Sequence, residues 1–321
     1  MKTARRIGVV LTDIGGPSDE SQVVPFIESF LADRAVLPLP QGMRELTARM
    51  IAARRAPVSL AHYRAIGGKS PLPEAVAAQV EVLGTALGGE LIVRHAFRHA
   101  PPRSDAVLGD LAREGVARVV IVPLFPQRSF TTTDSCVDDI TRAASHLGMA
   151  CVAVTSDPEA DGFVRAVVDL AGSCARDVQH MLLVAHGLPV SSVRKGDPYV
   201  EEVWRTAKRI SADLPHAGTW SLAFQSRVGP VQWVGPHIDE EIRQLAHEGI
   251  RSLAVVPISF TNENLETRYD LDIEAANLAR AEGIATCVRV PAVGCHAAYI
   301  EHLAELTRRA ALDAGWIEGG V

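Results

Sequence analysis

Short apolar runs alternate with amphipathic stretches along most of this chain. Each run is bounded by Gly, Pro or polar clusters, and helical patterns of roughly ten to twenty residues separate the runs. Because the runs are apolar on both faces, they suit a parallel sheet that is covered by helices on each side. The pattern therefore predicts an α/β fold of βαβ units. We expect strands at 7–12, 91–96, 118–123, 151–155, 181–186, 220–224, 252–257 and 286–290.

The chain also contains an internal repeat. DLAREGVARVVIVPLF at 110–125 matches QLAHEGIRSLAVVPIS at 244–259, with a constant offset of 134 residues. The strands expected at 7–12 and 181–186 end alike, in DIGGP and AHGLP. The repeat predicts two Rossmann-like α/β domains of similar design.

We place these domains at 1–150 and 151–321, with the last helix packing back on the first domain. Open α/β sheets bind ligands beyond the carboxyl ends of their strands. If the two sheet edges face one cleft, DIGGP, LFPQRS, AHGLP and ISFTNENLE surround a single site between the domains.

Bulk composition narrows the function classes. Of 321 residues, 47% are hydrophobic and 22% are charged, which is typical of a folded globular protein. The net charge of −6 provides no basic field for a nucleic-acid partner. No apolar stretch approaches the roughly 18 residues of a membrane span. The five cysteines are scattered and never form C-x-x-C, which argues against disulfides or structural zinc and favours a cytoplasmic location.

Two nucleotide-binding signals fail on inspection. GGKS at 67–70 resembles the end of a P-loop, but Tyr63 stands where that motif needs Gly, and Pro71 follows directly. DIGGPSD lacks the third glycine of a dinucleotide fingerprint. We interpret both stretches as turns.

A histidine and a line of acids are the strongest candidates for chemistry. His186 ends an apolar strand, so it is either a half-buried residue bonded to backbone or a proton acceptor or metal ligand. Glu266, Asp270 and Glu274 would stack on one face of a helix, where like charges cost a few tenths of a kcal/mol per pair. A solvated face is the alternative, and the helix macrodipole favours only the first acids, Glu263 and Glu266.

Three further segments allow two interpretations each. Trp233, beside Gly-Pro turns, is either core or the wall of a pocket for a flat ligand. The hydroxyls of 129–133 either cap the following helix or donate to an anionic ligand. The segment 41–57 predicts an amphipathic helix with Met43, Leu46, Met50 and Ile51 on one face, which either faces the core or stays exposed.

Six sequence blocks, in order, resemble ferrochelatase, the family that inserts ferrous iron into a porphyrin. The likeness extends over residues 7 to 310. The blocks are LTDIGGP, YRAIGGKSP, VPLFPQRSFTTTDS, AHGLPVSSVRKGDPY, FQSRVGPVQWVGP and PISFTNENLETRYDLDIE. Any one block is a weak signal, but six in the right order are highly specific.

The resemblance implies roles for individual residues. His186 and Glu266 match the pair that faces each other across the porphyrin, binds the metal and carries its insertion. Asp270 and Glu274 match the acids that lead protons or metal away from the site. Matching positions imply that the porphyrin pocket is lined by Ile14, Phe125, Ser129, Thr132 and Trp233.

The same resemblance implies partners. The substrates are protoporphyrin IX and ferrous iron, two protons are released, and no cofactor is bound permanently. Coproporphyrin, another tetrapyrrole and metal, or a non-catalytic porphyrin carrier are the alternatives. Phe130 and the lack of a cysteine-rich tail before Val321 predict no iron–sulfur cluster. We expect a monomer whose segment 41–57 forms an apolar lip, in transient contact with the inner face of a membrane.

Departures from the family pattern fall around the site. Many relatives carry His at Asn264, two residues before Glu266. Met or Leu is common at Ile14, Tyr at Phe125 and Tyr at His99. As pocket-wall changes, these substitutions bear on substrate fit and metal preference more than on the reaction.

Overall fold

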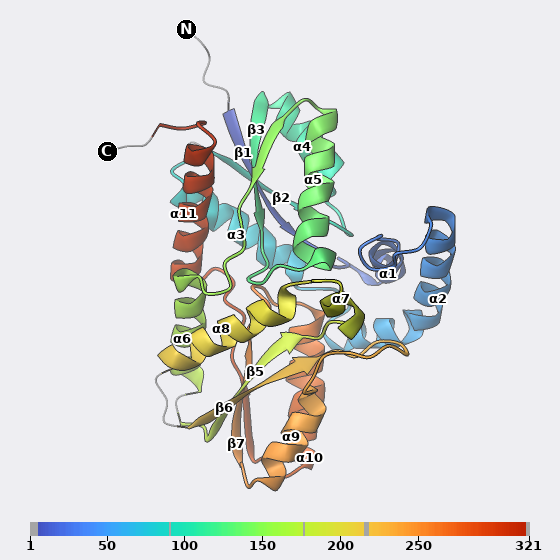
Figure 1. Cartoon of the computed structure of the whole chain (residues 1–321), viewed down its shortest axis with the longest axis vertical. Coiled ribbons are helices and arrows are strands. Elements are labelled where there is room, and N and C mark those ends of the chain that lie inside the picture. The colour runs from blue at the N-terminus through green and yellow to red at the C-terminus, as the bar shows by residue number, and fades with distance from the viewer. Residues whose placement is uncertain (1–5, 90, 176, 215–217, 319–321) are drawn as a thin grey trace. The chain divides into compact units, whose positions relative to one another are not determined.

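The chain forms two compact α/β units (Figure 1). The computed structural model describes residues 6–318 except 90, 176 and 215–217, so Val321 lies outside the described residues. Unit 1 comprises the chain up to Phe125, Phe130–Ser156 and the residues from Ile300 onward. Unit 2 comprises Pro126–Ser129 and Asp157–Tyr299.

Each unit is built on a parallel four-stranded sheet. In unit 1 the strand order is β2-β1-β3-β4, and in unit 2 it is β6-β5-β7-β8. All eight predicted strands are present, and no end differs from the prediction by more than two residues. They are β1 (Arg6–Asp13), β2 (Ile92–Phe97), β3 (Val116–Pro123), β4 (Ala150–Ala153), β5 (His180–His186), β6 (Thr219–Gln225), β7 (Ser252–Pro257) and β8 (Thr286–Arg289).

The two sheets have the same topology, which confirms two Rossmann-like halves. In both, the first strand lies between the second and the third, so the direction of winding reverses beside it. Repeat partners occupy equivalent places, because β3 and β7 are the third strands and end in Pro123 and Pro257. The binding crevice of such a sheet lies at this reversal, between β1 and β3 or between β5 and β7.

Helices connect the strands in both units. Unit 1 contains α1 (Val23–Leu31), α2 (Gln41–Ala65), α3 (Leu72–Ala86), α4 (Ser104–Arg113), α5 (Ser135–His146) and, from Ile300 on, α11 (Ala297–Asp313). Unit 2 contains α6 (Asp161–Cys174), α7 (Val190–Arg194), α8 (Tyr199–Asp213), α9 (Ile238–His247) and α10 (Ala276–Ala281). A π-helix precedes α5 at Phe130–Asp134, and a longer one precedes α10 at Glu266–Ala275.

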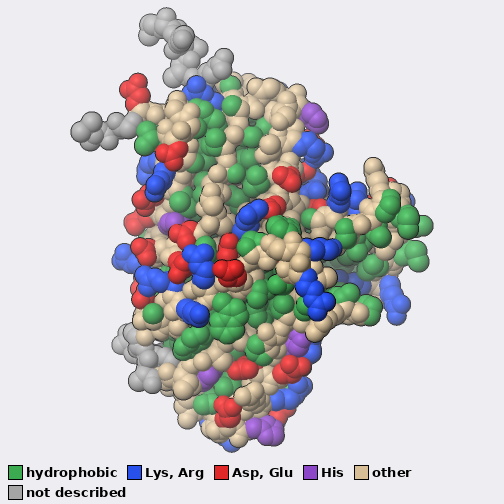
Figure 2. Space-filling model, in the orientation of Figure 1, with side chains coloured by type: hydrophobic (Ala, Val, Ile, Leu, Met, Phe, Trp, Pro, Cys, Tyr) green, Lys and Arg blue, Asp and Glu red, His purple; other side chains and the backbone are tan. Residues whose placement is uncertain are grey.

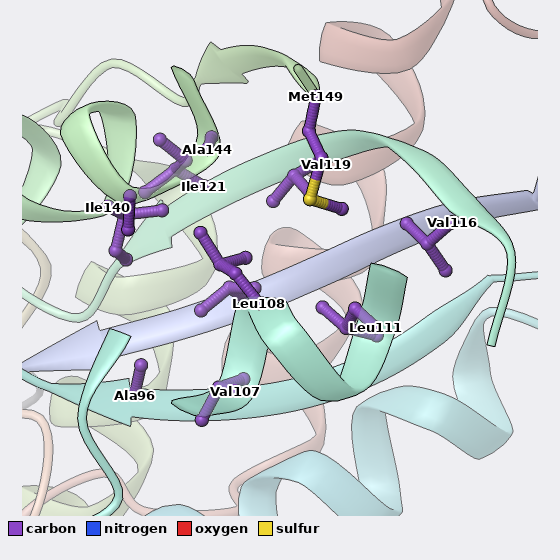
Figure 3. Packing of buried hydrophobic residues seen from close by; sticks show 12 residues of the cluster. Ala96, Val107, Leu108, Leu111, Val116, Val119, Ile121, Ile140, Ala144 and Met149 are labelled. Atoms are coloured by element: carbon purple, nitrogen blue, oxygen red, sulfur yellow. The ribbon is translucent and has the colours of Figure 1, made fainter. Parts of the chain in front are cut away.

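Apolar side chains from sheet and helices form a core in each unit. In unit 1, Leu108 and Leu111 of α4 and Ile140 of α5 pack with Val119 and Ile121 of β3 (Figure 3). Each fully buried Leu or Ile contributes about 1.5–3 kcal/mol. The matching cluster of unit 2 joins strands β5 and β7 to helix α9, with Leu182, Val255, Ile242 and Leu245 at its centre.

The glycines of DIGGP and GGKSP serve packing and turns. Gly15 has φ +86, and a Cβ on Gly16 would lie 2.5 Å from Ser70 Oγ. Ser70 N–H donates to the Pro17 carbonyl at 2.8 Å, so the two loops lie against each other. Close backbone approach is a standard reason for glycine, and the interpretation of GGKS as a turn is confirmed by its place between α2 and α3.

The apolar face predicted for 41–57 is exposed on α2. Met43, Leu46 and Met50 expose 60%, 61% and 66% of their surface, whereas Ala48 and Ala52 are the buried positions. Hydrophobic side chains accordingly gather over α2, with Lys and Arg beside them (Figure 2). The core-facing interpretation is therefore wrong for these three side chains, whereas Ile51 is half-buried. Among the described residues, no helix combines the length and apolar character needed to cross a bilayer.

Candidate active site

The carboxyl edge of the second sheet gathers the candidate catalytic residues of unit 2. His186 is the last residue of β5, and the chain leaving the neighbouring strand β7 leads to Glu266. The two segments are joined beyond the strands, since the His186 N–H donates to Ser259 Oγ at 3.0 Å. Both candidates therefore emerge at the point where the strand order reverses, the usual ligand position of this fold.

The imidazole of His186 is held in one tautomer. Nδ1 lies 2.6 Å from the Gly187 carbonyl oxygen. A carbonyl oxygen only accepts, so Nδ1 carries the hydrogen and Nε2 keeps its lone pair. Trp233 and Phe260 flank the ring edge-on, each with its centroid 6.4 Å away. A half-buried, oriented Nε2 of this kind can accept a proton or bind a metal ion.

Gly187 lets the end of β5 approach the end of β6 closely. Its N–H donates to the Gln225 carbonyl at 2.7 Å, and a Cβ would lie 2.8 Å from the Ser226 carbonyl oxygen. The same Cβ would come within 3.2 Å of the Trp233 ring. Any larger residue would push this loop away and change the position of His186.

The three acids lie on a π-helix rather than on the expected α-helix. Glu266–Ala275 form i→i+5 hydrogen bonds, a rare form that is frequent at functional sites. Glu266 and Asp270 are half-buried, whereas Glu274 is exposed. The acids therefore lead from the interior of the edge toward solvent.

Asp270 is the acid in this line whose pKa is strongly shifted. Burial, reinforced by the charges of Glu266 and Glu274, raises the pKa of Asp270 to about 8. A hydrogen bond from Ser226 Oγ, 3.3 Å from Asp270 Oδ2, opposes the rise. A carboxyl with a pKa near neutrality can both release and take up a proton under physiological conditions. The shift shows that the three acids interact electrostatically.

Ser226 adopts a backbone conformation that is unusual for a residue with a side chain. Its φ of 65° lies in the left-handed region, and its hydroxyl also donates to Gln225 Oε1 at 2.5 Å. Such strain persists where the surroundings enforce it, and it clusters at functional sites. Sequence reasoning missed Ser226, because nothing in QSRVGP specifies a positive φ at the serine.

Asn264 begins the π-helix. Its Oδ1 accepts a hydrogen bond from the Thr267 N–H at 2.9 Å, and its own N–H donates to Thr267 Oγ1 at 3.0 Å. This reciprocal pair has the geometry of a capping box. Asn264 therefore has a local structural role in this chain.

An ion-pair network beside the π-helix also escaped the sequence analysis. Glu263 pairs with Arg289 at 2.8 Å, and Arg289 reaches Asp272 at 2.5 Å. Burial raises the pKa of Glu263, but hydrogen bonds from Thr267 and Arg289 outweigh it and lower the pKa overall. The macrodipole explanation of Glu263 is thus incomplete. No local signal marks the pair, because its partners are 26 residues apart.

The remaining pocket candidates of unit 2 are Ser129 and Trp233. Ser129 is 2% exposed, and its hydroxyl donates to Asp197 Oδ2 at 2.9 Å. Asp197 in turn accepts from the Tyr199 N–H at the start of α8. Trp233 is half-buried, donates from Nε1 to the Val228 carbonyl at 3.0 Å and contacts His186. Of these two residues, Trp233 is the one whose side chain lies beside His186.

Three pocket candidates belong to unit 1, where they lie at the carboxyl edge of the first sheet. Ile14 follows β1 and Phe125 follows the adjacent strand β3, while Thr132 lies in the π-helix Phe130–Asp134. All three are half-buried. The 129–133 segment thus starts with a π-turn rather than with a simple hydroxyl cap of α5. The predicted cleft between the two edges stays a prediction.

His99 is buried beside the first sheet, and its expected place in the pocket wall stays a prediction. Its side chain is fully buried, with Nε2 3.7 Å from Asp33 and its ring edge-on to Phe30. Burial and the charge of Arg98 lower the pKa of His99 to about 3, so the ring is neutral. Arg98, three ångströms from Asp33, supplies the positive charge of this cluster. The position is buried because the backbone of His99 pairs with Ile14 beside the sheet.

Comparisons with known proteins were made on sequence and on structure. The family model described as Ferrochelatase matches residues 6–311. A protein named ferrochelatase from Geotalea daltonii is 33% identical over 313 residues, covering 95% of this chain and 98% of the relative. One of the same name from Sulfurihydrogenibium sp. is 32% identical, with 95% and 98% covered. Another from Synechococcus elongatus is 33% identical, with 95% and 82% covered.

Solved structures support the fold alone, since their sequences are distant. SirB from Bacillus subtilis with Fe3+ superimposes with a TM-score of 0.61 at 13% identity, covering 97% of this chain and 98% of its own. DR2241 from Deinococcus radiodurans, described as structurally similar to chelatases, gives 0.53 at 16% identity and covers 98% of this chain and 56% of its own. Both agree with the doubled parallel-sheet architecture.

Proposed function

The chain belongs to the ferrochelatase family, whose members are lyases of haem biosynthesis, and we propose that it inserts ferrous iron into protoporphyrin IX. The reaction replaces two pyrrole N–H protons by one ferrous ion and releases both protons. Iron is therefore a substrate, and the protein has to bend the ring, accept protons and receive the metal.

One observation carries the assignment of the proton acceptor. Because Nδ1 of His186 donates to the Gly187 carbonyl, Nε2 is the nitrogen left to accept a pyrrole proton or to touch the incoming metal. Trp233 and Phe260 beside the ring provide the apolar surface that a flat macrocycle needs. In this proposal, Ile14, Phe125, Ser129 and Thr132 complete the porphyrin pocket.

In this proposal, the acids of the π-helix bind the metal or a proton and conduct protons to solvent. Glu266 engages the metal or a proton, and Asp270 and Glu274 pass protons to solvent. The effect of the Glu266 and Glu274 charges on Asp270 supports a relay, because together with burial it raises the proton affinity of the middle carboxyl of the line. A relay also explains why like charges are kept in line on one helix, where local stability alone disfavours them.

The deciding experiment follows metalloporphyrin formation by absorption under anaerobic conditions. Purified protein is mixed with ferrous or zinc ion and, in parallel, with protoporphyrin or coproporphyrin. We expect catalysed metallation with protoporphyrin preferred. A clear preference for coproporphyrin would change the substrate and keep the reaction. Porphyrin binding without catalysed metallation would indicate a carrier and would overturn the proposal.

We also propose that the exposed apolar face of α2 touches a membrane surface from which porphyrin is collected. Met43, Leu46 and Met50 are exposed at helical spacing on α2, and Arg49 and Arg54 of the same helix suit anionic head groups. The double variant Met43→Glu/Met50→Glu should lose binding to vesicles of phosphatidylglycerol and phosphatidylethanolamine. Val82→Glu, which charges an exposed apolar residue of α3, is the matched control. No vesicle binding by the unaltered protein would refute this proposal.

A further inference from the structure

A buried arginine joins the edge of the second sheet to the acid-bearing π-helix. Arg289 is the last residue of β8, and its side chain is only 11% exposed. Nη1 donates to Glu263 Oε1 at 2.8 Å, while Nε and Nη2 form a fork to Asp272 at 2.5 and 3.1 Å. Paired, hydrogen-bonded and shielded from water, these contacts are of the strong kind.

The two acids held by Arg289 bracket the proposed catalytic segment. Glu263 lies three residues before Glu266, and Asp272 lies two residues after Asp270. Glu263 is held on both oxygens, because Oε1 also accepts from the Ala292 N–H at 3.1 Å and Oε2 accepts from Thr267 Oγ1 at 2.6 Å. One guanidinium therefore fixes the segment on either side of the residues that face the site.

A π-helix has a particular need for such an anchor. Its backbone form is rarely stable beyond one turn, yet here it continues from Glu266 to Ala275. Only contacts outside the helix can keep it in that form. Arg289 and Ser226 supply such contacts, since the first bonds Asp272 from β8 and the second bonds Asp270 from just beyond β6.

We propose that Arg289 is a positioning residue for the reaction, which holds the π-helix against β8 so that Glu266 and Asp270 point at the site. This inference rests on the proposed roles of those two acids. The arginine itself lies behind the segment and is bonded to Glu263 and Asp272, so it acts through them and contacts no substrate.

The variant Arg289→Lys tests this role without removing the buried charge. A lysine ammonium cannot form a fork to Asp272 while it reaches Glu263. Outer-shell changes of this kind typically cost about 10- to 100-fold in activity. We expect kcat for metallation to fall by about that factor, with the KM for porphyrin within about twofold, because the pocket wall is untouched.

Arg268 provides a matched control on the same two acids. It lies 3.6 Å from Glu263 and 3.5 Å from Asp272, and 48% of its side chain is exposed. Exposed ion pairs contribute little, so Arg268→Lys should leave kcat, KM and melting temperature unchanged. Equal losses in Arg268→Lys and Arg289→Lys would refute a specific role of Arg289.

Two measurements separate positioning from general destabilisation. The double variant Arg289→Lys/Glu266→Gln should lose less than the product of the two single losses, because Glu266 is one of the two acids that Arg289 positions. Amide hydrogen exchange should quicken in residues 264–275 and stay unchanged in β5 and β7. Fully multiplicative losses, or an exchange rate in 264–275 equal to that of the unaltered protein, would overturn the proposal.

The exchange measurement also keeps this inference distinct from the proposed function. If the unaltered protein metallates no porphyrin, the proposed function fails, while exchange in 264–275 still decides whether Arg289 holds the helix. Quickened exchange with normal kcat would show an anchor that does not position the reaction, and it would refute the proposal in that form.

Discussion

The two units share one topology, and four pairs of corresponding positions carry different kinds of side chain. Ile14 of DIGGP corresponds to His186 of AHGLP, and the offset of 134 residues makes Thr132 correspond to Glu266. The next two turns continue the pattern, since Cys136 and Ile140 correspond to Asp270 and Glu274. Unit 1 thus has apolar, thiol or hydroxyl side chains at the positions where unit 2 has the groups to which we assign proton exchange.

The helix after the third strand shows what these substitutions do. It begins in π form in both units, for five residues in unit 1 and ten in unit 2. In unit 1, Cys136 and Ile140 are buried and α5 packs into the core. In unit 2, Glu274 is exposed, whereas Asp270 is half-buried and its burial favours the neutral carboxyl. The comparison teaches that the scaffold is common to both halves, whereas the side chains to which we assign proton transfer are present on only one of them.

The largest expected contrast is between His186→Ala and Ile14→Ala. Removing a general base costs about 10²- to 10⁴-fold, so we expect kcat of His186→Ala to fall by at least about 100-fold. Ile14→Ala removes only apolar contact and should act on the KM for porphyrin. Steady-state metallation kinetics on both folded variants measure the difference. Near-normal kcat in His186→Ala would show that the two edges do not divide the chemistry as proposed.

The second contrast is between Glu266→Gln and Thr132→Val, which are nearly isosteric changes at corresponding positions. Glu266→Gln loses the charge that engages metal or proton, so kcat should fall by about 10- to 100-fold. Thr132→Val should have a smaller effect. The same assay measures both variants, and a larger loss in Thr132→Val would reverse the assignment of roles to the two units.

A third effect concerns the pH dependence of stability. The pKa of Asp270 is raised to about 8 in the folded protein, above its unfolded value near 3.9. The contribution of Asp270 to the free energy of unfolding is therefore fully present below the unfolded pKa and is lost as pH rises toward 8. Asp270→Asn removes the loss, so the melting temperature of the variant relative to the unaltered protein should increase between pH 5 and pH 8.5.

Glu274→Gln is the control for this effect. Removing the Glu274 charge lowers the pKa of Asp270, because that charge is one of the causes of its rise. The pH-dependent loss of stability should then be smaller than in the unaltered protein but still present. If the melting temperatures of Asp270→Asn and the unaltered protein differed by the same amount at every pH, the pKa of Asp270 would not be raised in the folded protein.

The smallest expected effect is that of the cap at Asn264. Asn264→Ala removes the acceptor of the Thr267 N–H, which costs about 1 kcal/mol. Thermal denaturation should show a melting temperature lower by about 2–4 °C. Asn264→Asp keeps an acceptor and should melt like the unaltered protein. Equal melting of all three would remove the structural role given to Asn264.

Much of the fold and part of the site could be predicted from sequence. Strands such as 252–257 are continuous apolar runs between punctuating residues, so their burial is encoded locally. His186, Glu266 and the other site residues were selected by their motifs, and their catalytic roles remain predictions. The π-helix could not be predicted, because i, i+4, i+8 acids share a face in α and π forms alike. Arg289 and Ser226 were missed, because a long-range ion pair and a positive φ leave no local pattern.

The sequence by itself determined the doubled α/β topology and the family, since hydrophobic periodicity, the repeat and six ordered blocks are properties of the chain alone. Only the tertiary structure decided the tautomer of His186, the proton affinity of Asp270 and the anchoring of the acids by Arg289. These depend on burial and on partners distant in sequence, because electrostatic energies are set by surroundings that form only when the chain is folded.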